Sequence, residues 1–234
     1  MRVVFVHGAC VRDGDWWWHR VADLLDRRGV TSVAPPLPSC GETGSAPGTT
    51  GPSLPDDVAA VRQLLAAGAE PTVVVAHSYG GVVAGDAAAG LPQVGHLLYI
   101  TSFLPEVGES LASFGDGSPA PYLDVRPDGT FGVRPELATA TFLQDCDPAD
   151  VEQAHARLVR QSVAVTGQPV RAAAWRDVPS TYLVCARDNG TPPAVQRAQA
   201  ARAGRVVEIE AGHHPMLSRP DAVADLVFEL LPAP

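Results

Sequence analysis

Ser78 stands at the end of a short β-branched run, within residues 73–81, VVVAHSYGG. Its surroundings follow the pattern small-x-Ser-x-Gly, in which a sharp turn from strand to helix exposes a strained serine at the carboxyl end of a parallel sheet. Ala76 and Gly80 supply the small side chains that this close approach requires, although the first position is more often glycine. The pattern predicts a nucleophilic Ser78, but an ordinary glycine-rich turn could hold the same residues, so partners elsewhere must decide.

A serine hydroxyl needs a base to take its proton, and the base needs an acid to fix its tautomer and stabilise its charged form. In a parallel α/β sheet, these partners follow later strands. Asp188 comes just after the apolar run 181–186, and His213 comes just after the run 205–210. The order Ser, Asp, His is the one that this architecture places along the chain. We therefore predict a catalytic triad of Ser78, Asp188 and His213.

Other residues compete for the same roles. His214 is the rival base, but a histidine directly after Gly212 approaches the serine more freely, which favours His213. Asp177 precedes its strand and would lie at the wrong end of the sheet. His77 is expected to pack beside the turn. The remaining histidines are interpreted as structural or as part of the first loop, and they are His7, His19, His96 and His155.

Acyl transfer develops an oxyanion, which preorganised donors must meet. The residue after the serine, Tyr79, offers its backbone N–H at the start of a helix. The loop after the first strand begins His7-Gly8 and can offer a second donor, for which Ala9 is favoured over Gly8 or Cys10. Cys10 has no positioned base, so we expect a buried neutral thiol rather than a second nucleophile.

Six apolar runs bounded by turn residues predict the strands that must position these groups. They lie at residues 2–6, 29–34, 73–76, 96–101, 181–186 and 205–210. Helical spacing separates most of them, and this alternation predicts right-handed crossovers and a parallel sheet whose carboxyl edge binds ligands. We expect an α/β fold with a mostly parallel, six-stranded sheet flanked by helices and carrying a cap insertion.

Capping signals predict where the helices begin. The expected N-cap residues are Asp15, Ser53, Thr191 and Ser218. Ser53 and Asp56 also match a capping box. Gly29 is expected at the carboxyl end of the first helix. Three consecutive tryptophans at 16–18 cannot all face the core, so one is predicted to contact a loop or a pocket rim.

Two segments interrupt the alternation. Residues 35–52 form a loop rich in Pro, Gly, Ser and Thr, which we expect to be a binding loop or a mobile one. Residues 106–175 are rich in Gly, Pro and Asp at first and then show helical patterns at 135–143 and 148–161. We interpret the domains as a core of residues 1–105 and 176–234 with a cap at 106–175. The alternative is irregular surface structure with its own small core.

Composition excludes several classes of function. The net charge of -9 argues against nucleic-acid binding, which needs clustered positive charge. All 17 basic residues are arginines, which excludes a Schiff-base lysine, a P-loop lysine and a Ser-Lys dyad. The four scattered cysteines, Cys10, Cys40, Cys146 and Cys185, suggest neither a zinc site nor a disulfide framework. The start, MRVVFVHG, lacks a signal-peptide pattern, and no apolar run reaches membrane-spanning length, so we expect a cytoplasmic protein.

Four segments together resemble the α/β-hydrolase superfamily, and within it the small capped esterases that include plant methylesterases, salicylate-binding esterases and hydroxynitrile lyases. The segments are FVHGAC, AHSYGG, WRDVPSTYLVCARDNGTPP and GHHPMLSRP, and the resemblance covers nearly the whole chain. It implies Ser78 as nucleophile, Asp188 as acid, His213 as base, and Ala9 and Tyr79 as oxyanion donors.

The chain departs from the cyanogenic lyases of this group at two positions. Those lyases place a lysine after the catalytic histidine and a threonine after the histidine of the first loop, where this chain has His214 and Gly8. Both departures count strongly against lyase chemistry. The sheet of the family also often has two additional N-terminal strands, and this chain starts at what would be the third.

We therefore predict a serine hydrolase that cleaves a carboxylic ester or lactone, or less readily an amide or thioester, of a small and fairly apolar molecule. The candidate substrate contacts are Phe103, Tyr122, Trp175, Met216 and Leu217, although ordinary packing explains each about as well. No metal or cofactor is expected, nor a membrane or nucleic-acid partner, and the protein is expected to be a monomer or a homodimer. Two alternatives stay open: a non-hydrolytic lyase or biosynthetic cyclase on the same scaffold, and a ligand-binding module with a degenerate triad.

Overall fold

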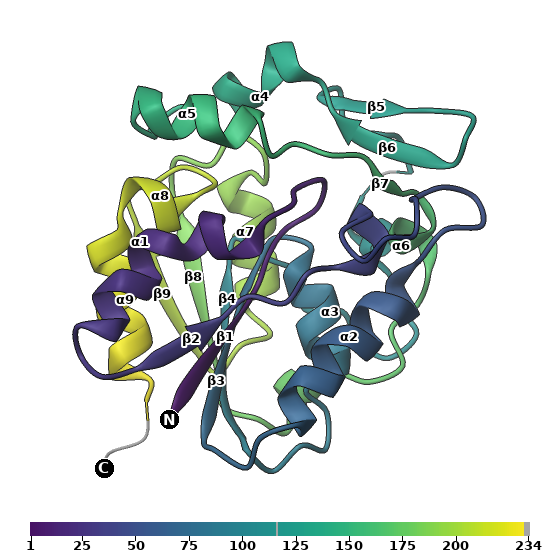
Figure 1. Cartoon of the computed structure of the whole chain (residues 1–234). Helices are drawn as coiled ribbons and strands as arrows, with labels where there is room; N and C mark the ends of the chain where they lie inside the picture. Colours follow the sequence, from purple (N-terminus) through teal and green to yellow (C-terminus); the bar gives the residue numbers. More distant parts are fainter. Residues whose placement is uncertain (116, 232–234) are drawn as a thin grey trace.

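A computed structural model describes residues 1–115 and 117–231. Six parallel strands form the central sheet, in the order β2-β1-β3-β4-β8-β9 (Figure 1). They are β1 (Arg2–Val6), β2 (Thr31–Val33), β3 (Thr72–His77), β4 (Val94–Ile100), β8 (Ser180–Cys185) and β9 (Arg205–Ile209). The predicted α/β class and the six-stranded parallel sheet are confirmed, with no strand end shifted by more than two residues.

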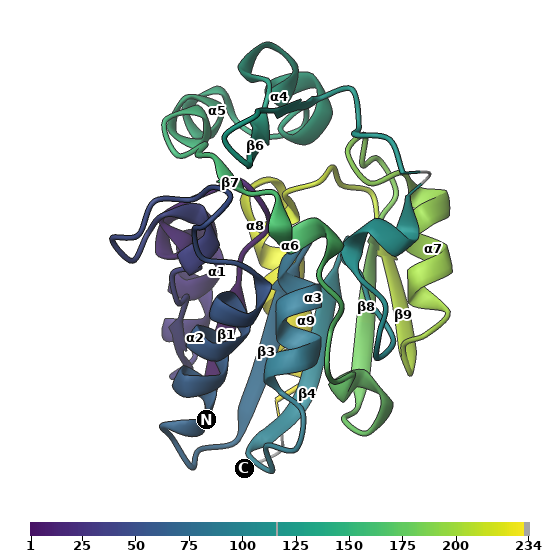
Figure 2. The same ribbon diagram turned by 90° about the vertical axis from the view of Figure 1, so that its right-hand side faces the viewer.

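Helices cover both faces of this sheet. One face carries α1 (Gly14–Asp26), α8 (Pro215–Ser218) and α9 (Pro220–Glu229), and the other carries α2 (Leu54–Ala66), α3 (Gly80–Ala87) and α7 (Pro193–Ala200). Figure 2 shows α2 and α3 in front of the sheet and α9 behind it. None of these helices, nor any other in the described chain, is long and apolar enough to cross a bilayer.

The side chains of β3 alternate between these two faces. Val73 and Val75 pack with α1 and α9, whereas Val74 and Ala76 pack with α2 and α3. All four residues are buried because both faces are covered, which is why β3 reads as a continuous apolar run.

The register of the strands brings the first loop and the serine turn together. Val6 at the end of β1 is paired with Ala76 of β3, and His77 is paired with Ile100 of β4. The residues that follow these three strands therefore leave the sheet side by side. Ser78 lies in the middle of this group, because β3 lies between β1 and β4.

The segment between β4 and β8 lies beyond the carboxyl ends of the main strands (Figure 1). We call residues 106–175 the insertion. Its elements are β5 (Leu123–Val125), β6 (Thr130–Val133), α4 (Pro135–Phe142), α5 (Pro148–His155), β7 (Gln161–Ser162) and α6 (Ala164–Gly167), with 3-10 helices at Leu111–Phe114 and Ala174–Arg176. The three strands form an antiparallel sheet that was not predicted, because strands of two to four residues show no usable periodicity.

Several predicted helix ends are wrong by a few residues. The N-cap of α1 is Asp13, while the Asp15 carboxylate accepts a hydrogen bond from the Ala34 N–H at 3.2 Å. The C-cap of α1 is Arg27 and not Gly29, which was predicted there; Gly29 lies two residues further on, with a φ of 75° that suits a glycine. The capping box of Ser53 and Asp56 is confirmed.

The later helices also start or stop elsewhere than predicted. Helix α7 has Pro192 as its N-cap in place of Thr191, and α9 has Arg219 in place of Ser218. Ser218 instead ends α8 and donates a hydrogen bond to Asp145 at 2.9 Å. Helix α5 ends at His155 rather than near residue 161, because the chain turns there to enter β7.

Candidate active site

The backbone of Ser78 lies in the left-handed region, with a φ of 51°, between the end of β3 and the start of α3. A Cβ on Gly80 would lie 2.4 Å from the Val6 carbonyl oxygen and 2.7 Å from that of His7. A Cβ on Gly81 would lie 2.1 Å from Ser102 Oγ. The strained turn is therefore present, and its glycines are needed mainly because α3 begins against β1 and the segment after β4.

Asp188 and His213 form a buried pair where β8 and β9 end. His213 Nδ1 lies 2.7 Å from Asp188 Oδ2, and the two residues are only 4% and 3% exposed. The Asp188 carboxylate also accepts hydrogen bonds from Thr101 Oγ1 at 2.5 Å and from the backbone of Gly190 and Thr191 at 2.7 and 3.0 Å. These donors hold the carboxylate in a single orientation.

Burial alone would raise the pKa of Asp188, but the adjacent His213 and the hydrogen bonds from Thr101 and Thr191 lower that pKa below its ordinary value. Asp188 is therefore ionised at neutral pH and can only accept hydrogen bonds. The proton between the two side chains must then sit on His213 Nδ1, which leaves Nε2 as the basic nitrogen.

His214 is held away from Asp188. Its Nδ1 donates to the Phe142 carbonyl oxygen at 3.0 Å, and its ring lies 4.7 Å from that of Trp17. Burial lowers the pKa of His214 to about 3, so this ring stays neutral. The structure thus pairs Asp188 with His213, in line with the predicted preference.

His77 packs beside the serine turn, as predicted. Its Nε2 donates to the backbone oxygen of His213 at 2.8 Å, and burial lowers its pKa well below the ordinary value. A neutral His77 can serve as a fixed donor to the backbone of His213. The contact therefore ties the turn after β3 to the loop after β9.

The loop after β1 passes directly beside the serine. A Cβ on Gly8 would lie 3.1 Å from the Cβ of Ser78. Cys10 has a φ of 60°, and its N–H donates to Gln161 Oε1 at 3.0 Å. Because the Cys10 amide is already occupied by Gln161, Gly8 and Ala9 are the other candidates for an oxyanion donor in this loop. The Cys10 thiol is buried, and burial raises its pKa, as expected for an unreactive cysteine.

His7 connects the same loop to Glu42. Its Nε2 lies 3.1 Å from Glu42 Oε2, and Glu42 also accepts hydrogen bonds from the N–H groups of Asp13 and Leu37 at 2.7 and 3.1 Å. Burial would raise the pKa of Glu42, but His7 and these backbone donors lower it. The segment 35–52 was predicted to be a binding or mobile loop; part of it, at Glu42, supports the loop after β1.

A cavity of about 430 Å³ opens onto Ser78 and His213. Its walls come mainly from the insertion and include Leu111, Phe114, Leu123, Phe131, Val133, Phe142, Leu143 and Val163. Among the described lining residues, none is Asp, Glu or Arg. The described chain also holds no cluster of three His, Cys, Asp or Glu side chains suited to a metal ion.

Two of the five predicted substrate contacts, Phe103 and Tyr122, line this cavity. The other three do not. Trp175 Nε1 donates to the Pro105 carbonyl oxygen at 3.0 Å, and its ring packs against the core near α3. Met216 and Leu217 are buried in the core between the sheet, α1 and α9, because the turn of α8 directs them away from the cavity.

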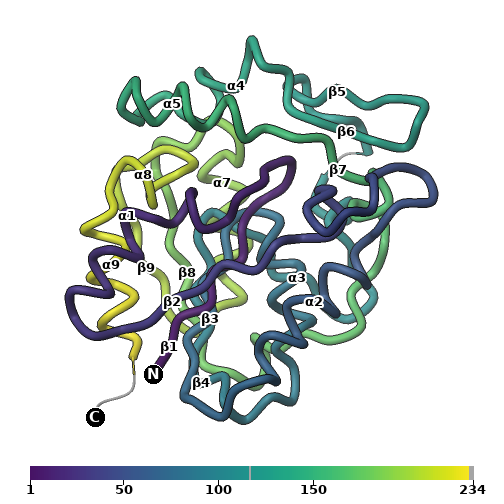
Figure 3. The backbone as a smooth tube through the Cα atoms, in the orientation of Figure 1, coloured from purple at the N-terminus to yellow at the C-terminus, as the bar shows by residue number. Residues whose placement is uncertain are grey.

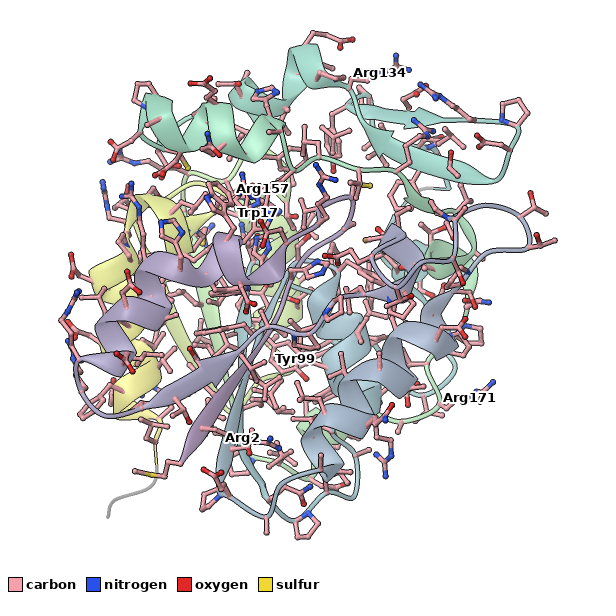
Figure 4. The ribbon with its side chains drawn as sticks, viewed as in Figure 1. Arg2, Trp17, Tyr99, Arg134, Arg157 and Arg171 are labelled. Atoms are coloured by element: carbon pink, nitrogen blue, oxygen red, sulfur yellow. The ribbon has the colours of Figure 1, made fainter. Side chains whose placement is uncertain are left out.

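The tryptophans at 16–18 divide as predicted. Trp18 stacks on Phe5 in the core, with ring centroids 4.4 Å apart, and Trp17 lines the cavity. Trp16 is partly exposed, and the guanidinium of Arg157 lies over its ring. The central carbon of that guanidinium is 4.4 Å from the centroid of the Trp16 ring. Figure 4 labels Trp17 and Arg157, which lie near one another where α1 meets the insertion.

The family of the protein follows from comparison with known proteins. The model of the Alpha/beta hydrolase family matches residues 3–226. The chain belongs to the α/β hydrolase family. This confirms the resemblance found in the sequence, and many family members carry a Ser, Asp and His in this chain order.

Individual relatives of this α/β hydrolase cover nearly its whole length. An α/β hydrolase of Aspergillus novofumigatus is 28% identical over 96% of this chain and 94% of its own. Salicylic acid-binding protein 2 of Nicotiana tabacum is 28% identical over 97% and 95%. The crystal structure of a pyrethroid hydrolase from Sphingobium faniae has a TM-score of 0.85 at 23% identity, with 98% and 96% coverage, which shows the shared fold. Names such as hydrolase and esterase among the relatives support a hydrolytic enzyme.

Sequence reasoning missed two polar residues that hold the site of this α/β hydrolase. Thr101 directly follows β4 and donates to Asp188, with its own φ at 40°. Asp145 of the insertion accepts hydrogen bonds from the Gly212 N–H at 2.6 Å and from Ser218 Oγ at 2.9 Å, so it holds the loop before His213. A position directly after a strand could have indicated Thr101, but no local pattern indicates Asp145.

Proposed function

We propose that this α/β hydrolase is a serine esterase or lactonase that forms an acyl-enzyme on Ser78. Ser78 Oγ attacks the ester carbonyl carbon while its proton passes to His213 Nε2. The tetrahedral intermediate collapses, the bond to the leaving oxygen breaks, and His213 returns the proton to the departing alcohol. Water then attacks the acyl group with His213 again as base, and Ser78 is released with the acid product.

Asp188 remains ionised through these steps and orients His213. The backbone N–H groups of Ala9 and Tyr79 are the proposed oxyanion donors. Ala9 is favoured because it is the loop residue after His7-Gly8, the position that the family resemblance gives to this donor, and because the amide of Cys10 is occupied by Gln161. Tyr79 is favoured because it stands at the amino end of α3, where peptide dipoles favour negative charge.

One observation carries the proposal: the strained Ser78 and His213 line the same cavity, and His213 is paired with the buried Asp188. No hydrogen bond joins Ser78 to His213 among the residues described. Such bonds are often long in unliganded enzymes and shorten when substrate binds. A small rotation of either side chain on substrate binding is therefore part of the proposal.

The cavity supports an uncharged, largely apolar substrate. Its described walls offer no ion pair to a charged group, and burying an unpaired charge costs several kcal/mol. We propose residues 106–175 as the cap that shapes this cavity over a core of residues 1–105 and 176–234, with Phe103 and Tyr122 as substrate contacts. A relative named as a pyrethroid hydrolase, from Sphingobium wenxiniae, is 27% identical over 99% of this chain and supports a substrate of this kind.

The test is turnover of 4-nitrophenyl butyrate and of a panel of apolar esters and lactones. We expect Ser78→Ala to lower kcat by at least ~10³-fold, because the triad residues act together. Ser32→Ala on the edge strand β2 is the matched control and should retain wild-type kcat. Wild-type turnover that survives in Ser78→Ala would overturn the proposal, as would a wild type that binds these compounds without cleaving any, which would favour the non-hydrolytic alternatives.

A further inference from the structure

A chain of buried hydrogen bonds runs behind the proposed oxyanion donors. The Cys10 N–H donates to Gln161 Oε1 at 3.0 Å, and Gln161 Nε2 donates to Ser39 Oγ at 2.8 Å. Ser39 Oγ donates to Asp57 Oδ2 at 2.5 Å, and the Tyr79 hydroxyl donates to the same oxygen at 2.7 Å. All five residues are at most 1% exposed.

The two ends of this chain are the two halves of the proposed oxyanion hole. Cys10 directly follows Ala9, so the hydrogen bond that the Cys10 N–H donates to Gln161 fixes the peptide plane next to the Ala9 amide. Tyr79 carries the second donor in its own backbone. The bond from Val159 N–H to the Cys10 carbonyl oxygen, at 2.9 Å, holds the loop to the insertion a second time. Figure 3 shows this loop rising from β1 to reach the insertion.

One member of this chain of hydrogen bonds, Asp57, is a buried carboxylate that forms no salt bridge in the described structure. Among the described residues, the hydrogen bonds to Asp57 come from the N–H and hydroxyl of Ser39 and from the hydroxyl of Tyr79. Burial raises the pKa of Asp57, and these hydrogen bonds oppose the rise. Apolar residues of similar volume often serve stability as well as such buried polar groups do, so orientation is the better reason for this arrangement.

We propose that Gln161 and Asp57 are positioning residues that hold the Ala9 and Tyr79 amides at a fixed separation around the oxyanion. The inference rests on the proposed function. Oxyanion donors act because they are preorganised, and a misplacement of about 1 Å can cost ~10²-fold in rate. Since Gln161 belongs to β7, seating of the insertion also sets the geometry of the oxyanion hole.

The test uses Tyr79→Phe, which removes only the hydroxyl that reaches Asp57, and Gln161→Met, which keeps the length of the side chain. We expect each to lower kcat by ~10- to 100-fold while KM changes less than about threefold. The rate of covalent labelling by a fluorophosphonate should fall by a similar factor. The double variant should lose little more than the larger single loss, because either change already interrupts the chain.

Tyr99→Phe is the matched control. Tyr99, labelled in Figure 4, is fully buried near the carboxyl end of β4, and its hydroxyl has no hydrogen-bond partner among the described residues. It should retain wild-type kcat. If Gln161→Met does not fold, as judged by thermal unfolding, Tyr79→Phe alone decides.

Wild-type kcat in Tyr79→Phe, or a change in KM alone, would overturn the positioning role and leave the proposed function intact. Fully multiplicative losses in the double variant would contradict a single connected chain. Absence of turnover and labelling in the wild type would instead overturn the proposed function.

Discussion

The carboxyl edge of the main sheet, where its strands end, and the insertion above it contribute different kinds of side chains to the site. At the edge, a few polar groups are each held by several hydrogen bonds, as Asp188 is by Thr101, Gly190, Thr191 and His213. In the insertion, the cavity walls are mainly aliphatic and aromatic and act through shape. The difference suggests that the edge determines the reaction and the insertion determines the substrate, and substitutions can separate the two.

The largest expected effect comes from the edge. Asp188→Asn keeps the volume of the side chain but removes the charge that holds His213 in the required tautomer and stabilises its protonated form. We expect kcat to fall by ~10⁴-fold with little change in KM, measured on 4-nitrophenyl butyrate. Asp177→Asn, at the exposed residue that competes for this role in the sequence, should be unaffected. Equal activity of Asp188→Asn and Asp177→Asn would contradict the assignment of Asp188 to the triad.

A wall residue should change selectivity instead. Phe114 lines the cavity and stacks with Phe103, with ring centroids 5.7 Å apart. Phe114→Ala should shift kcat/KM by ~10- to 100-fold toward esters with bulkier acyl groups, because the pocket becomes larger. The kcat for the acetate ester should stay within about threefold. Phe228→Ala, on an exposed part of α9, is the control, and a large loss on acetate would show that the insertion also supports the chemistry.

The smallest effect concerns the contact between the two regions, where His214 donates to Phe142 of α4. The folded pKa of His214 is about 3, well below the ~6.5 of an unfolded histidine, so the unfolded state binds more protons between these values. Stability is therefore retained above pH 6.5 and falls as the pH drops toward 3, by up to ~1.4 kcal/mol per unit for this residue. The lowered pKa of His77 acts in the same direction.

Urea unfolding at pH 7.5, 6.0 and 5.0 measures this loss. His214→Gln should reduce the loss of unfolding free energy between pH 6.0 and 5.0 by up to ~1.4 kcal/mol. The same loss in both proteins would mean that His214 does not titrate on unfolding in the manner proposed.

The difference between the carboxyl edge of the sheet and the insertion also explains which residues could be predicted from the sequence. Ser78 directly follows β3, and Asp188 and His213 lie three and four residues after β8 and β9, so a local pattern and the order of strands were enough to indicate them. Gln161 and Asp145 act through contacts between segments more than 60 residues apart, and no local pattern marks such pairs. The short strands of the insertion were missed for lack of periodicity. Met216 and Leu217 were wrongly predicted as substrate contacts, because the direction of a short helix after the site cannot be read from composition.

The role of Asp57 could have been indicated by the sequence. It lies on the stripe of Leu54, Val61 and Leu65, which helical spacing places on the buried face of α2. An acidic residue on an apolar stripe indicates a buried polar contact, and here that contact is with Ser39 and Tyr79.

The most direct test of the account is intact-protein and peptide mass spectrometry after reaction with a fluorophosphonate. We predict a single adduct per chain, located on the peptide that contains Ser78, with none in Ser78→Ala and much slower formation in Asp188→Asn. An adduct on a different residue, or labelling of Ser78→Ala at the wild-type rate, would contradict the assignment of Ser78 as the nucleophile.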